Sequence, residues 1–310
     1  MGRKQTALLG QLSDIDLRLL RVFRAVAEAG GFSAAELKLN IGRSTISRHI
    51  KDLELRLGIV LCHRGRSGFA LTDEGEQIYQ ATLRLLSSLD HFRGEVADVH
   101  KRMTGHITVG LFDKTASNPE SRIHKAMQMF DDLAPEVTLD IIVEPLNDLE
   151  AGVMEGRIQI AVIPTHRESS SLVYQHLFYE QMYLYCGAEH PLFQKDSREV
   201  TVEDVRATKY AGLGYHSPNM ELSSELGWAR DATVFDQEAI IHCLLSGRYV
   251  GYLPDHYAEP FVRKGLIRPL AKEKFNYQCD FVAMHRMSPK PSRVVETFWD
   301  CLREAHQENN

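Results

Sequence analysis

The fold of the N-terminal region is decided by residues 32–58, FSAAELKLNIGRSTISRHIKDLELRLG. Ser33 followed by Glu36 has the spacing of a helix-capping box and predicts a short helix over about 34–39. The turn Asn40-Ile41-Gly42 follows. The next segment, Arg43 to Leu57, repeats apolar residues at three- and four-residue steps and predicts a longer helix with Ile46, Ile50, Leu53 and Leu57 on its buried side.

The opposite face of this longer helix is polar and basic. An arginine can bond to O6 and N7 of guanine, while hydroxyls and lysine reach phosphates or base edges, so such a face suits a DNA major groove. A charged face is also typical of an ordinary solvated helix, but the short helix and turn before it favour DNA binding. The candidate DNA-binding residues here are Arg43, Ser44, Thr45, Ser47, Arg48 and Lys51.

The flanking segments complete a winged helix-turn-helix. Residues 14–28 have the apolar periodicity of an amphipathic helix, which Gly30-Gly31 ends. After the longer helix, residues 59–61 and 69–71 predict two short strands around a basic, glycine-rich turn. Arg64 and Arg66 lie at the tip of this wing, where they can enter a minor groove or bind phosphates. Thr72 is the expected N-cap of the following helix.

Charge is distributed unevenly along the 310 residues. The net charge of −6 divides into 12 basic and 6 acidic residues up to Thr72, and 24 basic and 36 acidic residues after it. A basic N-terminal region on an acidic remainder fits a polyanion bound at one end, although chance can also produce such a difference.

Several classes of protein are disfavoured. There is no export signal and no apolar run long enough to span a bilayer, so we expect a cytoplasmic protein with no membrane partner. The five cysteines are widely spaced and never form C-x-x-C, which disfavours disulfides and thiolate metal sites. We expect no cofactor and no metal.

Residues 73–101 form a predicted linker helix. Its apolar residues recur at heptad spacing, interrupted by Thr82, which is typical of a coiled coil over about three repeats. Packing against its own chain is the alternative to pairing with a second chain. The stripe consists of Ile78, Leu85, Leu89, Phe92, Val96 and Val99.

From Gly105 onward, predicted strands alternate with predicted helices, which indicates an α/β region. Strands are expected at 107–111, 137–143, 158–163, 182–186, 209–213 and 249–253, and helices at about 147–155, 202–205 and 237–246. Asn118-Pro119 is the expected start of a helix through Leu133.

Two other functions, an enzyme and a free solute-binding protein, are alternatives to DNA binding. An enzyme is disfavoured because no phosphate loop, H-E-x-x-H, G-x-S-x-G or dinucleotide motif is present. A free solute-binding protein fits the α/β region alone, but the basic N-terminal region and the lack of an export signal count against it.

The N-terminal motifs together resemble the LysR-type transcriptional regulators. The resemblance rests on Phe23-x-x-Val26, Gly31-Phe32-Ser33-x-Ala35, Ser44-x-x-Ser47-x-x-Ile50-x-x-Leu53-Glu54-x-x-Leu57-Gly58, Arg64 and Leu71-Thr72-x-x-Gly75. Glu36 and Cys62 depart from the family pattern, at positions that concern packing. Further along, Gly105-x-Ile107-x-Val109-Gly110, His190-Pro191-Leu192 and residues 247–254 resemble the family's effector domain.

The resemblance implies an all-α winged helix-turn-helix head joined to an α/β domain like periplasmic solute-binding proteins. We expect a DNA-binding domain at 1–72, a dimerisation helix at 73–104 and an effector domain at 105–310. The latter would contain one subdomain at about 105–164 and 265–310, and a second at about 165–264. The candidate effector-binding residues are Thr115, Ser117, Asn118, Thr165, His166, Tyr215 and His216.

The implied partners are double-stranded DNA with an interrupted palindromic operator, a small-molecule effector and a second copy of the chain. Tetramers are common in the family, and RNA polymerase is a further candidate partner. Lys114 and a helix N-terminus favour an organic anion as effector, whereas Asp113 and Glu144 oppose it.

Overall fold

The structure, a computed structural model, describes residues 12–65, 68–99, 103–165, 167–215 and 227–307. Contacts group them into two compact units. The head unit is the chain up to Arg93 together with Glu155–Arg157, and the body unit is Gly94–Met154 with the chain from Ile158 onward.

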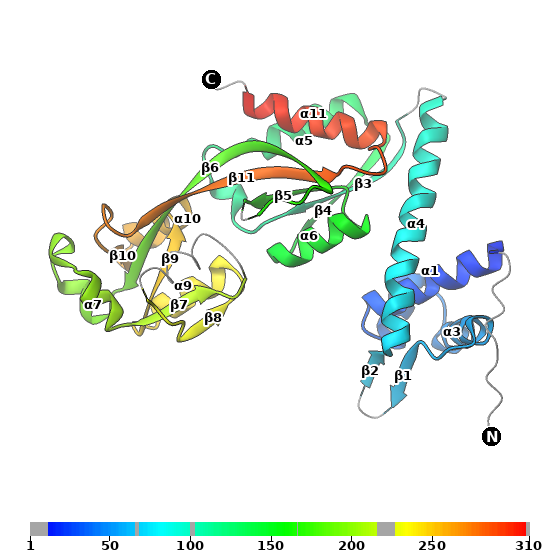
Figure 1. Cartoon of the computed structure of the whole chain (residues 1–310), viewed down its shortest axis with the longest axis horizontal. Coiled ribbons are helices and arrows are strands. Elements are labelled where there is room, and N and C mark those ends of the chain that lie inside the picture. The colour runs from blue at the N-terminus through cyan, green and yellow to red at the C-terminus, as the bar shows by residue number, and fades with distance from the viewer. Residues whose placement is uncertain (1–11, 66–67, 100–102, 166, 216–226, 308–310) are drawn as a thin grey trace. The chain divides into compact units, whose positions relative to one another are not determined.

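The head unit begins with the helices α1 (Asp14–Glu28), α2 (Phe32–Leu39) and α3 (Arg43–Leu57) (Figure 1). The predictions for α1 and α3 are confirmed to the residue. Their apolar stripes meet in one core, in which Phe23, Ile46 and Ile50 are fully buried. Asn40 adopts the left-handed conformation that ends α2.

The predicted capping box at Ser33 is wrong. The helix α2 begins at Phe32 with Gly31 as its N-cap, so Ser33 already lies inside the helix and cannot cap it. The Glu36 carboxylate instead accepts a hydrogen bond from the backbone N–H of Arg43, at 2.5 Å. Glu36 therefore caps the beginning of α3.

The wing is a hairpin of β1 (Cys62–Gly65) and β2 (Gly68–Leu71), which are antiparallel. The first strand begins three residues later than predicted, because Leu61 is fully buried in the head core and its N–H bonds to the Glu54 side chain at 2.9 Å. Thr72 caps the next helix through a bond from the Gly75 N–H to its hydroxyl, as predicted.

The linker helix α4 (Asp73–Val99) uses its apolar stripe in two ways. Near its beginning, Ile78 and Leu85 pack on the head core. Further along, Phe92 is 60% exposed and Val96 is 44% exposed. The first half of the stripe thus packs on its own chain, whereas Phe92 and Val96 are exposed, and pairing of α4 with a second chain stays a prediction.

The body unit is built on a nine-stranded mixed sheet, in the order β4-β3-β5-β11-β6-β9-β7-β8, with β10 beside β6. The strands are β3 (Gly105–Leu111), β4 (Val137–Val143), β5 (Ile160–Pro164), β6 (Leu172–Gly187), β7 (Lys209–Leu213), β8 (Ala232–Val234), β9 (Tyr249–Pro254), β10 (Ile267–Pro269) and β11 (Asn276–Arg286).

The described helices of the body include the four that the sequence predicts and two further helices after Pro254 that it does not. They are α5 (Ile123–Leu133), α6 (Leu146–Glu155), α7 (Val202–Arg206), α9 (Gln237–Leu245), α10 (Asp255–Arg263) and α11 (Arg293–Gln307), with short 3-10 turns η1 (Thr115–Ser117), η2 (Pro191–Gln194) and η3 (Ser197–Glu199). The rings of Phe130 and Phe298 pack edge to face between α5 and α11.

Two long strands, β6 and β11, run antiparallel along almost their whole length and join the two halves of the sheet (Figure 1). The predicted strand at 182–186 is only the end of β6. Each half keeps its own parallel strands, β4-β3-β5 in one and β9-β7-β8 in the other. The two halves of the body are therefore two α/β lobes on one continuous sheet.

The prediction that a helix starts at Asn118 is wrong. Asn118 is buried, and its side chain accepts from the Glu120 N–H and donates to the Tyr179 carbonyl, both at 2.9 Å. It therefore closes a turn, and α5 begins only at Ile123. Cys62, Cys186, Cys279 and Cys301 are buried, and no disulfide joins the described cysteines.

Candidate functional sites

The solvent-facing side of α3 carries the predicted DNA-binding residues. Arg43, Ser44, Arg48 and Lys51 are exposed, and Thr45 and Ser47 are half-buried. Because an exposed guanidinium or ammonium group is free to reach a phosphate or a base edge, this side of α3 can act as a recognition surface. Arg64 lies in β1, and Arg66 lies outside the described residues.

An ion pair between the buried carboxylate of Asp16 and the exposed Arg56 fixes α3 against α1. The Asp16 carboxylate is 1% exposed and binds the guanidinium of Arg56, near the end of α3, through two oxygens. The N–H and hydroxyl of Ser13 also donate to it, at 2.8 and 2.6 Å. These donors, Arg56 first, hold the pKa of Asp16 well below its usual range. The orientation of the recognition helix thus rests on a fully hydrogen-bonded carboxylate.

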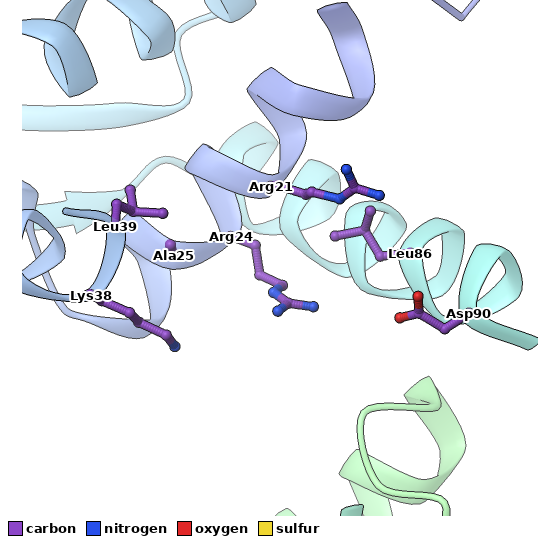
Figure 2. Close-up of a pocket in the computed structure, with 7 residues that line it drawn as sticks. All are labelled: Arg21, Arg24, Ala25, Lys38, Leu39, Leu86 and Asp90. Carbon is purple, nitrogen blue, oxygen red and sulfur yellow. The ribbon is translucent and has the colours of Figure 1, made fainter. Parts of the chain in front are cut away.

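A hollow of about 240 Å³ lies beside α1, α2 and α4, away from α3 (Figure 2). Arg21, Arg24 and Lys38 point toward it, and Leu86 and Asp90 of α4 lie on its other side. Glu28 forms ion pairs with both Arg24 and Lys38. Two of the three cations are thus already partnered by a carboxylate, which makes this hollow a weaker anion site than the α3 surface.

In the body, the loop after β3 bridges the two lobes. Asp113 accepts a hydrogen bond from the N–H of Gln237, the first residue of α9, at 2.9 Å. Beside it, the Lys114 ammonium binds Glu238 at 2.8 Å. Each bond joins residues 124 positions apart in the chain. The end of β3 therefore faces the N-terminus of α9 where the two lobes meet, a junction that we call the cleft.

A second bridge runs from this loop to α10 and β6. The Ser117 hydroxyl lies 2.9 Å from Nδ1 of His256, whose Nε2 lies 2.9 Å from a carboxylate oxygen of Glu180. The side chains of His256 and Glu180 are only 6% and 5% exposed. Burial raises the pKa of Glu180, although its bond to His256 opposes this. The three side chains form one polar chain at the cleft.

Several buried polar atoms at this cleft have no hydrogen-bond partner among the residues that the structure describes. They are Oδ1 of Asp113, Oγ1 of Thr165, the hydroxyl of Tyr215 and Oε1 of Gln237. Burial raises the pKa of Asp113 and that of Tyr215, and the charges of Asp113 and Glu180 raise the latter further. Buried polar groups without partners are rare in folded proteins, so this group of atoms marks a place where a ligand can bind.

The predicted effector-binding residues have different surroundings. Ser117 and Tyr215 lie in the networks just described, and Thr165 contributes an unpartnered hydroxyl. Thr115 is buried at the start of η1, and Asn118 is engaged in its turn. His166 and His216 lie outside the described residues.

Sequence reasoning missed Gln237, Glu180 and His256 as cleft residues. His256 lies two residues after the end of β9, so the rule that sites lie at the carboxyl ends of strands would have found it. Glu180 is the one carboxylate in β6, a strand rich in apolar and aromatic residues, which is itself a signal. Gln237 has no such signal in the sequence, because its role depends on contact with a loop that is far away along the chain.

Two searches of the described part of the chain gave negative results. No helix there is both long and apolar enough to span a membrane. No group of three or more His, Cys, Asp or Glu side chains is arranged there to hold a metal ion.

Two family profiles match the chain. Residues 17–76 match the bacterial regulatory helix-turn-helix protein of the lysR family, and residues 100–307 match the LysR substrate binding domain. The chain is 37% identical over 302 residues to the HTH-type transcriptional activator BauR of Pseudomonas aeruginosa, covering 97% of this chain and 99% of that protein.

Solved structures share the fold. CbnR, a LysR family transcriptional regulator, matches with a TM-score of 0.64 at 19% identity over 94% of this chain and 99% of that one. Full-length CbnR complexed with its target DNA matches with a TM-score of 0.62 at 20% identity, over 93% and 99% of the two chains. These findings confirm the family and the fold expected from the sequence. The chain belongs to the LysR family of transcriptional regulators, in which a DNA-binding helix-turn-helix is joined to an effector-binding domain.

Proposed function

We propose that this regulator reads its operator with the α3 residues Arg43, Ser44, Thr45, Ser47, Arg48 and Lys51, while Arg64 and Arg66 of the wing bind the adjacent minor groove or phosphates. The observation that carries this proposal is the exposed basic side of α3, held in place by Asp16 and Glu36. Arg48, in the middle of that side, is the expected reader of a base edge.

The second half of α4 is the proposed dimer contact. Phe92 and Val96 are large apolar side chains exposed on one stripe of a long helix, and a second copy would bury them. A dimer places two copies of α3 on neighbouring half-sites, which fits an interrupted palindrome.

The cleft between the body lobes is the proposed effector site, lined by Thr115, Ser117, Asn118, Thr165 and Tyr215, with His166 and His216 as further candidates. Support comes from the three bridges that cross it and from its unpartnered polar atoms. An effector that binds the closed cleft more tightly than the open one shifts the population of assembly states, and thereby the spacing or bending of bound DNA.

The wider assignment follows from these sites. We propose a cytoplasmic regulator without catalytic activity, divided into a DNA-binding domain at 1–72, a dimerisation helix at 73–104 and an effector domain at 105–310. RNA polymerase is the expected partner if the chain activates transcription, as the name of its relative BauR states for that protein. In vitro transcription with and without the chain separates activation from repression.

Replacing Arg48 by Ala tests the DNA-binding assignment. Loss of one base contact weakens operator binding by about 1–3 kcal/mol, roughly fivefold to 150-fold, and relaxes base preference at one position. Titration by mobility shift measures both. Arg24→Ala is the matched control, because Arg24 lies in α1 and pairs with Glu28. Equal affinity and base preference in Arg48→Ala and the native protein would refute the role of Arg48.

Replacing Thr115 and Ser117 together by Ala tests the effector assignment. We expect a reporter gene to lose its response to the inducing condition, while operator affinity without effector stays within about threefold of the native value, since the head is untouched. A normal response in this double variant would place the effector site elsewhere.

A further inference from the structure

The chemistry of the effector is constrained by how the N-terminus of α9 is used. A free helix N-terminus attracts anions, because its first N–H groups lack partners. Here Asp236 accepts from the N–H of Ala239 at 2.7 Å, and Asp113 accepts from that of Gln237 at 2.9 Å. Two carboxylates of the chain thus already occupy the place where an anionic ligand would bind.

The unpartnered atoms beside this helix are mostly acceptors. Gln237 is 2% exposed, and its Oε1 receives no hydrogen bond from any described residue. The same holds for Oδ1 of Asp113, whose other oxygen binds the Gln237 backbone. A carboxylate oxygen and an amide oxygen can only accept, so both require a donor from outside the present set of contacts.

The surrounding charge favours a cation as that donor. Asp236 lies near enough to Asp113 to interact with it electrostatically. Glu180 interacts in the same way with both Asp113 and Asp255. The nearby basic groups are already engaged, since Lys114 pairs with Glu238 and His256 with Glu180. A neutral N–H donor would satisfy the acceptors but leave the excess negative charge uncompensated.

We propose that the effector carries a protonated primary amine, which binds between Oδ1 of Asp113 and Oε1 of Gln237. Its three N–H donors match these two acceptors and the Tyr215 hydroxyl, which can also accept. This inference rests on the proposed effector site. It replaces the sequence-based expectation that the effector is an organic anion. The amine is the end of the effector that this part of the cleft recognises.

Four probes with four carbons each test the inference: butylammonium, 4-aminobutyrate, butyramide and butyrate. Saturation-transfer NMR on the full chain reports which of them binds. We expect signals from the two amines and none from butyrate. In Asp113→Asn, which keeps an acceptor for the Gln237 N–H, the affinity for the amines should fall roughly tenfold to a hundredfold, because a charge-assisted hydrogen bond is lost.

Two further variants refine the test. Asp236→Asn removes a neighbouring charge while keeping an oxygen to cap α9, and should weaken amine binding less than Asp113→Asn does, because Asp236 adds charge without contacting the amine. Gln237→Met removes the amide acceptor at similar size and should weaken amine binding. Melting curves of each variant show that it is folded.

The outcomes distinguish failure of the ammonium inference from failure of the proposed effector site. Binding of butyrate but not of the amines, amine binding unchanged in Asp113→Asn, or no signal from either amine would each overturn the ammonium inference. If Thr115→Ala/Ser117→Ala keeps a normal effector response, the cleft itself is the wrong site, whatever the probes show.

Discussion

Asp16 in the head lies in the first turn of α1 and Asp113 in the body binds the first residue of α9, but the surroundings of these two carboxylates differ. Asp16 receives hydrogen bonds from Ser13 and from Arg56 on both of its oxygens. One oxygen of the Asp113 carboxylate accepts a hydrogen bond from the backbone N–H of Gln237. Its second oxygen has no partner among the described residues. The pKa of Asp16 is lowered, whereas burial raises that of Asp113.

The contrast separates a structural carboxylate from one that is available to a ligand. A buried charge with all its hydrogen bonds made stabilises the arrangement around it, while removal of one partner is costly. A buried charge with an unmet acceptor costs folding energy that a ligand can recover on binding. The head uses the first kind to orient α3, and the body keeps the second kind at its cleft.

Replacing Asp16 by Ala should give the largest effect. The hydrogen bonds to a charged group are lost and Arg56 loses its partner, so the head should be destabilised by about 1.5–3 kcal/mol. Chemical denaturation followed by circular dichroism measures this. Asp14→Ala, at an exposed position of the same helix turn, is the control. A loss no larger than that of the control would mean that Asp16 does not hold α3 in place.

The Asp16 contribution has a defined pH dependence. Because its pKa in the folded chain lies below the unfolded value of about 3.8, the stabilisation is complete above about pH 4 and is lost as the pH falls further. The difference in stability between the native chain and Asp16→Ala should therefore be constant from pH 7 to about 5 and shrink below about 4. A difference that grows on acidification would contradict the assignment.

Replacing Glu36 by Ala should have an intermediate effect. The N–H of Arg43 loses its acceptor, and α3 loses a negative charge near its N-terminus, at a cost of about 1 kcal/mol. Glu36→Gln keeps the acceptor and should recover more than half of this loss. Thermal melting compares the three proteins, and equal stability of the Ala and Gln variants would show that Glu36 does not cap α3.

Replacing Asp113 by Asn should have the smallest effect on the free protein, and the opposite sign to Asp16. Since the folded pKa of Asp113 is raised, its ionised form costs stability at neutral pH, and this cost disappears as the pH falls toward 3.8. The Asn variant should thus be as stable as the native chain or more stable at pH 7, with the difference vanishing in acid. A clear loss of stability at pH 7 would make Asp113 a structural residue like Asp16.

The elements that depend on local pattern were predictable. The helices α1 and α3 and the strands β4 and β7 follow from periodicity alone, because each buries one face or lies wholly inside. The failures share a cause. Asn118-Pro119 has the same local signal for a helix start as for a turn, and contact with Tyr179 decides for the turn. The length of β6 is decided by its pairing with β11, about a hundred residues later.

The same limit applies to the sites. The basic side of α3 is local and could be found from spacing. At the cleft, the loop after β3 could be located from the carboxyl-end rule. Its partners could not, since the bond between Asp113 and Gln237 joins distant segments, and an acceptor without a donor becomes visible only when every neighbour is known.

The central claim is that α3 gives this chain operator-specific DNA binding, and genome-wide mapping of sites bound by the tagged native chain and by Arg48→Ala tests it most directly. Bound fragments are then titrated by mobility shift at several salt concentrations, because non-specific binding weakens steeply with salt. The account predicts discrete palindromic sites that survive physiological salt and are lost or broadened in the variant. Diffuse, salt-labile binding that is the same for both proteins would contradict it.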